Sequence, residues 1–323
     1  ATASEFAGSG VARDGGPDST GARPSASTSN FSGSGDAGDG GPTSAGVRGA
    51  LAKDFSRTRT RADYLAVRAE PACRATSLAR FAAIERLRCC LREVAGVDVR
   101  ATAAELSALA GVCVDEALDE ALARADARFG APLAAAGGRC PIVVLGMGKL
   151  GGGELNAGSD IDLCFFYGTD DGATAQTEDS LHAYFSKVAE WTVKALDEPG
   201  DDGAVWRTDL RLRPEGTRGP LVNSVAAAER YYENWGRTWE RAALLLASPI
   251  AGDRPLGDEL QQALTPFVWR RTVDPKLPGE LAALLQQARM KASKQDLKLG
   301  TGGIREVEFF VQGLQLVWGG KNP

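Results

Sequence analysis

Residues 141–167 place a glycine-rich turn and two aspartates between two apolar runs that have the composition of β-strands. The runs are Ile142 to Leu145 and Ile161 to Tyr167. Successive side chains of a strand point to opposite faces, so Asp160 and Asp162 should emerge on the same side. Two carboxylates this close repel each other unless a positive group lies between them. The segment therefore predicts a strand, a turn and a second strand that begins at a charged site.

Length and composition narrow the class of protein. The 323 residues are enough for about two domains of roughly 150 residues each. The formal net charge of -5 argues against nonspecific binding of nucleic acid, which basic surfaces provide. No apolar run reaches the roughly 18 residues of a membrane span, and no signal sequence is recognisable. Six scattered cysteines without Cys-x-x-Cys spacing suit reduced thiols. We expect a soluble cytoplasmic protein with no membrane or nucleic-acid partner.

The chain has one histidine, His182, which limits the available chemistry. A catalytic triad, a histidine-activated cysteine or a histidine-rich metal site would each depend on this one residue. Its neighbours predict a position on the polar face of a helix, so we interpret it as a surface residue. Acid–base chemistry then falls to carboxylates, which favours a hard metal ion.

Composition divides the chain into four regions. Residues 1–48 are rich in Gly, Ser, Ala, Asp and Thr and predict a disordered low-complexity leader. Residues 49–138 predict a helical subdomain, in which one helix ends near Phe129. Residues 139–250 mix α and β patterns and form the expected catalytic core, and 251–323 return to a helical pattern that we interpret as truncated. The N-terminal helical pattern rests on an apolar stripe, with arginines opposite, at Leu78, Phe81, Ile84, Leu87, Leu91 and Val94.

The glycine turn matches two nucleotide-binding motifs only superficially. Gly146, Gly148 and Gly151 have Gly-x-Gly-x-x-Gly spacing, but residues 152–159 are too few for the roughly 10 to 12 residues of a βαβ crossover. A Walker A loop would need Ser or Thr after Lys149. The remaining interpretations are a turn that only reverses the chain, and a turn whose backbone N–H groups approach a phosphate. The candidate phosphate-binding residues are Gly148, Lys149, Gly151, Gly152 and Ser159.

A third β-like run, Ala204 to Pro214, carries an acid flanked by arginines on one face. If this run lies beside Ile161 to Tyr167, its Asp209 meets the earlier pair of aspartates. Three carboxylates select hard cations such as Mg²⁺ or Mn²⁺, and Arg211 and Arg213 would hold phosphate oxygens. The alternative is a polar edge hairpin whose Asp and Arg side chains pair in solvent.

A glycine turn, Ser-Asp-Ile-Asp-Leu and a later strand aspartate form the pattern of the nucleotidyltransferase superfamily. Further motifs closely resemble the bacterial bifunctional glutamine synthetase adenylyltransferase/adenylyl-removing enzymes. The resemblance covers about residues 60–323. It implies an α+β fold, with a polymerase-β-like mixed sheet flanked by helical subdomains. The motifs that carry it are GMGKLGGGELN (146–156), DLRLRP (209–214), GPLV (219–222), WER (239–241) and GGIREVEF (302–309).

The resemblance is to the N-terminal half, because C-terminal motifs usually carry an aromatic before Glu154 and Thr-Asp in place of Arg305-Glu306. It implies phosphorolytic removal of AMP from a tyrosine of glutamine synthetase, with ADP as product. Implied ligands of Mg²⁺ (or Mn²⁺) are Asp160, Asp162 and Asp209. Implied partners are glutamine synthetase, nucleotide and orthophosphate, and in the full-length enzyme a nitrogen-status signalling protein. The alternatives are adenylylation from ATP, and a noncatalytic docking module, which should have lost one of the aspartates.

Two further segments leave alternatives open. Gly302 and Gly303 precede a helix whose N-terminus could hold an anion near Lys298. At most one of Glu306 and Glu308 should face such a site. The alternative is a core helix with its apolar side chains (Val307, Phe310, Val311, Leu314) directed inward. An aromatic run at Tyr231, Tyr232, Trp235 and Trp239 either stacks a base or belongs to the core.

Overall fold

The computed structural model describes residues 57–272, 274–290 and 296–320. The leader expected at 1–48 lies outside the described residues. The two apolar runs of the central segment form antiparallel strands, β2 (Ile142–Met147) and β3 (Ile161–Tyr167), as predicted. The turn between them contains one short helix, α6 (Gly148–Gly151).

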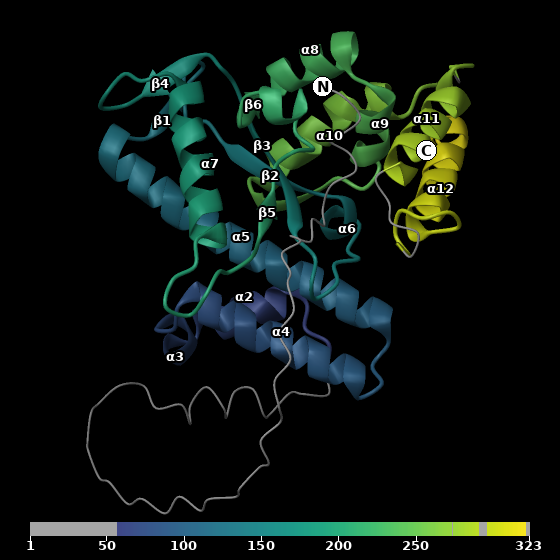
Figure 1. The fold of residues 1–323 in the computed structure, drawn as a ribbon. Coiled ribbons are helices and arrows are strands. Elements are labelled where there is room, and N and C mark those ends of the chain that lie inside the picture. The colour runs from purple at the N-terminus through teal and green to yellow at the C-terminus, as the bar shows by residue number, and fades with distance from the viewer. Residues whose placement is uncertain (1–56, 273, 291–295, 321–323) are drawn as a thin grey trace, which may run out of the picture.

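These strands are the centre of a five-stranded mixed sheet (Figure 1). Four strands have the order β5-β3-β2-β7, and the fifth, β6, pairs with β3. β7 (Ser248–Gly252) is antiparallel to β2. β5 (Thr208–Asp209) and β6 (Val222–Ser224) both run parallel to β3, β5 beside its start and β6 beside its end. The sheet therefore continues past residue 250, the expected end of the core, because β7 runs to Gly252.

The third β run is much shorter than its alternating pattern predicts. Only Thr208 and Asp209 pair with the sheet, and a turn follows at once. The run precedes the short helix η1 (Gly216–Arg218), so the chain leaves the edge of β3 before it returns as β6. The prediction of one continuous strand from 204 to 214 is wrong, since alternation of charged and apolar residues does not by itself supply a hydrogen-bonded neighbour.

Helices cover both faces of the sheet. On one face lie α5 (Val99–Phe129) and α7 (Leu181–Asp197), and on the other α8 (Val225–Trp235), α9 (Thr238–Leu244) and α10 (Arg254–Val268). The side chains of β3 alternate accordingly. Leu163 and Phe165 join the core under α5 and α7, whereas Cys164 and Phe166 join the core under α8 and α10. Asp162 is two residues before Cys164 on the same strand, so its side chain points to this second face.

The N-terminal helices α2 (Arg61–Ala69) and α4 (Leu78–Val94) pack against α5, and the short helix α3 (Pro71–Arg74) packs against α2. The predicted inward stripe of α4 is partly wrong. Phe81 is buried, but Leu87, Leu91 and Val94 are 59%, 47% and 86% exposed. The opposite side of the helix faces α5 and carries charged residues, so the packing surface of α4 is defined by ion pairs as well as by apolar contacts.

Buried ion pairs connect α4 to α5 and to the segment before α2. Glu85 accepts from Arg59 at 2.6 Å and from Arg88 at 2.7 Å. Glu105 on α5 pairs with both Arg88 and Arg92 and also accepts the backbone N–H of Arg59 at 2.8 Å. All five side chains are at most 4% exposed. Each buried charge is therefore opposed, the condition under which ionic groups persist inside a protein.

The C-terminal helices α11 (Leu277–Arg289) and α12 (Ile304–Trp318) pack against each other and against α9. The core-helix alternative for α12 is wrong. Its buried residues are Phe309 and Leu316, whereas the four expected inward residues are at least 45% exposed (Val307, Phe310, Val311, Leu314). In the aromatic run, Tyr232 and Trp239 are buried as core residues, and Trp235 is 74% exposed.

Smaller features complete the fold. β1 (Pro132–Ala134) and β4 (Gly172–Thr174) form a two-stranded antiparallel sheet that the sequence did not predict. α5 ends at Phe129, as predicted, before Gly130 with φ of 80°. All six cysteines are free, as expected. In the described part of the chain, no helix is long and apolar enough to cross a membrane.

Candidate functional site

Three aspartates meet where β3 begins. Asp162 on β3 lies in register with Asp209 on β5, and Asp160 immediately precedes β3. The carboxylates come together because the parallel pairing of β5 with β3 sets Ile161 against Thr208 and then aspartate against aspartate. All three aspartates line one cavity of about 680 Å³. The sequence-based expectation that Asp209 joins the earlier pair is confirmed in its geometry.

The electrostatics of Asp162 reflect this crowding. Burial raises the pKa of its carboxyl to about 7, and the negative charges of Asp209 and Asp160 add to the effect. Arg211 and Lys298 act in the opposite direction, but not enough to cancel it. A carboxyl in this position is only partly ionised near neutral pH, so the site as it stands is short of positive charge.

Two arginines hold the outer aspartates. The guanidinium of Arg207 pairs with Asp160, and Nε of Arg211 lies 3.0 Å from both carboxylate oxygens of Asp209. These contacts direct two of the three carboxylates toward guanidinium groups instead of toward a common centre. In the ranges that the structure describes, no three acidic, His or Cys side chains form a ready ligand set for a metal ion.

The donor chemistry nevertheless fits a hard cation. The three side chains offer only oxygen ligands, from two adjacent strands, at one end of a cavity. Burial is the main cause of the raised pKa of the Asp162 carboxyl, and the negative charges of Asp209 and Asp160 raise this pKa further. A divalent ion at this point would replace the two arginines as the counter-charge.

Arg213 is not brought to the cavity. Its guanidinium donates instead to backbone carbonyls, to Leu210 at 2.7 Å and to Pro220 and Gly219 at 3.1 and 3.2 Å. These bonds fasten the loop that follows β5 and so support the position of Asp209. The predicted common face of Arg211 and Arg213 fails because the strand ends before either residue.

The glycines of the turn have distinct environments. Gly148 lines the cavity with φ of +53°, and an added Cβ would lie 3.7 Å from a carboxylate oxygen of Asp162. Gly151 faces away, where a Cβ would come within 1.8 Å of the backbone oxygen of Leu246. Gly152 caps α6 and does not line the cavity. Of the predicted glycines, only Gly148 reaches the cavity, and Gly151 serves a close contact between backbones.

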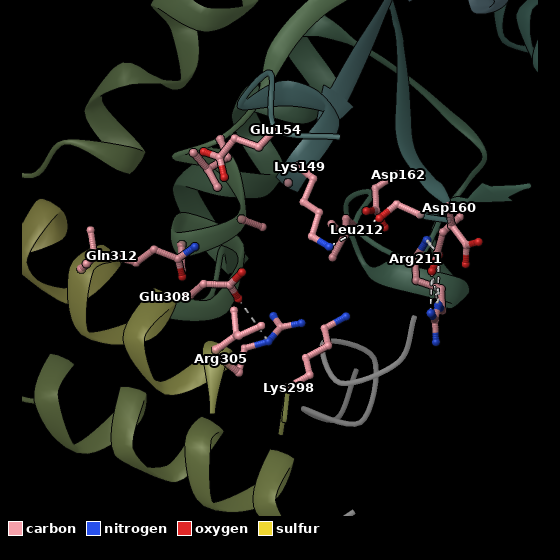
Figure 2. Close-up of a pocket in the computed structure, with 18 of the residues that line it drawn as sticks. Lys149, Glu154, Asp160, Asp162, Arg211, Leu212, Lys298, Arg305, Glu308 and Gln312 are labelled. Carbon is pink, nitrogen blue, oxygen red and sulfur yellow. Dashed lines mark hydrogen bonds and ion pairs between the residues drawn. The ribbon is translucent and has the colours of Figure 1, made fainter. Parts of the chain in front are cut away.

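Two predicted polar residues of the turn do line the cavity. Nζ of Lys149 lies 3.4 Å from Oγ of Ser159 and 3.5 Å from Oδ1 of Asn156, and Ser159 also donates to Asn156. Lys149 reaches into the space beside Asp162 (Figure 2). The turn therefore presents an ammonium group and a hydroxyl to the same cavity as the aspartates.

The opposite wall comes from the C-terminal part of the chain. Lys298, Arg305 and Glu308 face the aspartates across the cavity, as Figure 2 shows. Glu306 instead pairs with Arg289 at 2.6 Å, so only one of the two glutamates faces the site, as expected. Glu154, Gln312 and Gln315 also line the cavity and were not predicted to do so. A usable signal existed, because α12 carries a polar stripe at helical spacing among mostly apolar residues, formed by Arg305, Glu308, Gln312 and Gln315.

The cavity thus has an acidic wall on the sheet, a basic and mixed wall on α12 and the loop before it, and Lys149 between them. A phosphate ester with a divalent cation would satisfy both walls, because the cation neutralises the carboxylates and the basic side chains neutralise phosphate oxygens. The arrangement is chemically suited to transfer at phosphorus.

Comparisons with known proteins match the chain to two families. The family described as glutamate-ammonia ligase adenylyltransferase matches residues 51–263. A second family, described as GlnD PII-uridylyltransferase, matches residues 281–323.

Similar curated proteins are named bifunctional glutamine synthetase adenylyltransferase/adenylyl-removing enzymes. The Pseudomonas aeruginosa protein is 42% identical over 253 residues, which cover 76% of this chain and 26% of that protein. The Hahella chejuensis protein is 42% identical over 232 residues, covering 70% and 24%. The Thioalkalivibrio sulfidiphilus protein is 41% identical over 244 residues, covering 74% and 25%. The chain spans about a quarter of the length of the curated relatives it matches.

Proposed function

The chain belongs to the glutamate-ammonia ligase adenylyltransferase family, and on this basis we propose that its mixed sheet is a nucleotidyltransferase core of polymerase-β type. We propose further that this core removes AMP from an adenylylated tyrosine of glutamine synthetase by phosphorolysis. The observation that carries the proposal is the register of Asp162 against Asp209, which gathers three carboxylates at one end of a cavity with a basic opposite wall.

Asp160, Asp162 and Asp209 are the proposed ligands of Mg²⁺, for which Mn²⁺ can substitute. The all-oxygen donor set supports this choice. When bound, such ions neutralise phosphoryl oxygens and activate the attacking oxygen. Arg207 and Arg211, which now hold two of the carboxylates, would be released to bind phosphate oxygens.

In the proposed reaction an oxygen of orthophosphate attacks the phosphorus of AMP, and the bond from that phosphorus to the tyrosine oxygen breaks. The products are ADP and a tyrosine hydroxyl, which takes up the proton that orthophosphate loses. Lys149, Ser159 and Gly148 are placed to hold the phosphate of the AMP group beside the aspartates. Rate enhancement would come from positioning and from neutralised charge, with no covalent enzyme intermediate.

The direction of transfer is the finer part of the proposal. The names of the relatives include both attachment and removal of the adenylyl group. Removal is favoured by the motif at the start of α12, in which Arg305-Glu306 resembles the N-terminal half of the bifunctional enzymes. Adenylylation from ATP is the alternative, and glutamine synthetase is the proposed protein substrate in both cases.

Two reactions with the purified chain test the proposal. Adenylylated glutamine synthetase with Mg²⁺ and orthophosphate should yield ADP and unmodified synthetase, followed by chromatography and by the mass of the modified peptide. Unmodified synthetase with ATP labelled at the α-phosphate tests the opposite direction. Label transfer without ADP formation in the first reaction would reverse the assigned direction. Inactivity in both would refute the catalytic proposal.

Matched variants separate catalysis from folding. Asp162→Asn should abolish ADP formation, because it removes the central carboxylate of the three. Asp258→Asn changes an exposed aspartate on α10, outside the cavity, and should leave the rate unchanged. Full activity of Asp162→Asn would show that the carboxylates do not carry the reaction.

A further inference from the structure

The loop before α12 has a compact fold that is built on Asp296. Its carboxylate accepts the backbone N–H groups of Lys298 at 2.8 Å and Leu299 at 2.9 Å, and its carbonyl accepts that of Gly300 at 2.8 Å. The chain then turns at Gly303, whose backbone N–H donates to the carbonyl of Gly300 at 2.9 Å. The position of Lys298 is therefore set by backbone hydrogen bonds on both sides of it.

The first N–H groups of α12 are already used within this loop. Ile304 donates to the carbonyl of Leu297 and Arg305 to that of Lys298, each at 3.0 Å, and Glu306 donates to Gly303 at 3.0 Å. The expectation that this helix N-terminus itself holds an anion is therefore wrong. The bond between Arg305 and Lys298 instead ties together the two residues whose basic side chains enter the cavity.

Gly303 makes this arrangement possible. A Cβ at this position would lie 2.8 Å from the carbonyl oxygens of both Gly300 and Leu297 and 2.9 Å from that of Lys298. Any side chain would therefore push the loop away from the helix and carry Lys298 out of place.

The basic side chains sit close enough to repel one another. The pKa of Lys298 is lowered by burial first, and then by the positive charges of Arg305 and Lys149. Glu308 and Asp162 oppose this shift. Glu308 lies 3.5 Å from Nε of Arg305 and faces the same part of the cavity as the basic side chains. An anion bound among them would relieve the repulsion.

The comparisons point to the same role. The segment 281–323 matches a family named for uridylyl transfer, whereas 51–263 match one named for adenylyl transfer. The two names differ in the nucleotide and share the transfer of a nucleotidyl group. Both segments therefore match families whose named reactions transfer a phosphate-containing group.

We propose that Lys298 and Arg305 form a subsite for a phosphate anion opposite the three aspartates, and that Lys149, which lies between the two walls, contacts both this anion and the phosphate of the AMP group. Two ligands carry such a phosphate group, namely free orthophosphate and a nucleoside triphosphate with its terminal phosphates. The subsite rests on the proposed function, since phosphorolysis requires orthophosphate on the side of the AMP phosphorus opposite the tyrosine oxygen that leaves. Its geometry places that phosphate against α12.

Binding without glutamine synthetase tests the subsite apart from the overall reaction. Titration calorimetry with orthophosphate should give a dissociation constant no weaker than about 10 mM, within the range where ΔG is a few kcal/mol. Lys298→Gln and Arg305→Gln should each weaken binding about tenfold, because each removes one charge-assisted contact. Arg289→Gln and Lys187→Gln, which change basic residues in ion pairs outside the cavity, should leave it unchanged.

Competition distinguishes the two sources. Orthophosphate should bind together with AMP and Mg²⁺ but be displaced by ATP, whose terminal phosphates would occupy the same place. Orthophosphate and ATP bound at once, or unaltered orthophosphate binding in both variants, would overturn the subsite. So would the absence of orthophosphate binding in the unaltered chain.

Two measurements exclude a merely structural effect. Arg305→Lys and Lys298→Arg keep the charge and should recover at least half of the lost binding free energy, and thermal melts should show all variants folded. Equal loss in the charge-keeping and neutral variants would contradict the subsite. Intact orthophosphate binding in a chain that forms no ADP would refute the proposed reaction but leave the subsite standing.

Discussion

Asp162 and Asp209 lie directly opposite each other on neighbouring parallel strands. Like charges at such a position destabilise a sheet. Asp162→Asn should therefore stabilise the metal-free protein by about 1–3 kcal/mol at pH 8, while it removes catalysis. Urea denaturation in the presence of a chelator measures the first effect. Asp258→Asn, on the exposed side of α10, is the control and should change neither property.

The same carboxyl gives a pH dependence. Its folded-state pKa, raised to about 7, exceeds the value of 3.8 that an aspartate has in an unfolded chain. A raised pKa contributes stability that is fully present below the unfolded pKa and is lost as pH rises through the folded one. The stability difference between the Asn variant and the unaltered protein, measured without divalent ions, should therefore grow from pH 4 to pH 8. A constant difference over this interval would contradict the assigned environment.

Glu308 should weaken phosphate binding at the proposed subsite, because its carboxylate lies beside the basic side chains. Glu308→Gln should tighten orthophosphate binding about two- to fivefold, because it removes one negative charge that repels the anion and that solvent and salt partly screen. The gain should shrink at high salt. Glu306→Gln, in the neighbouring ion pair with Arg289 outside the cavity, should have no effect. Weaker binding in Glu308→Gln would indicate that Glu308 supports Arg305 more than it competes with the anion.

The turn glycines provide a stability test with an internal control. Gly151→Ala would force a Cβ to within 1.8 Å of the Leu246 carbonyl oxygen, so the backbone must move. We expect a loss of about 3 kcal/mol or more, near the upper range for overpacking. Gly158→Ala, in the same turn, meets nothing within 4 Å and should stay within about 0.5 kcal/mol. Chemical denaturation followed by circular dichroism compares the two.

The buried ion pairs of the helical region predict a strong effect away from the site. Glu105→Gln removes a charge that opposes Arg88 and Arg92, so the buried arginines lose compensation. Breaking such a pair costs about 3–5 kcal/mol. Glu190→Gln breaks an exposed pair with Lys187 and should cost less than about 1 kcal/mol. Similar losses in both variants would show that burial does not set the strength of these contacts.

Local patterns were sufficient for the centre of the fold. Two apolar runs predicted β2 and β3. The alternation of side chains along a strand predicted that Asp160 and Asp162 share a side. The meeting with Asp209 was also foreseen, although β5 has only two residues. The length of β5 could not be predicted, because a strand needs a partner and β3 is shared between β5 and β6.

Tertiary contacts decided the rest. The orientation of α4 follows from Glu85, Arg88 and Arg92 pairing with residues far along the chain, which periodicity of apolar residues does not detect. The basic wall of the cavity required α12 to pack beside α9, over a distance in sequence that no local pattern spans. The polar stripe of α12 could be recognised in the sequence, but only the folded chain shows that this stripe faces the aspartates.

The close approach of Gly151 to the segment around Leu246 also has a kinetic consequence. The carbonyl of Gly151 accepts the hydroxyl of Ser248 at 2.9 Å, across 97 positions of sequence. Closing a loop of this size is slow compared with forming a local helix or hairpin. The turn would thus reach its final shape only after the strand that carries Ser248 has docked, so nascent chains that stop short of this strand should emerge with an unfinished cavity.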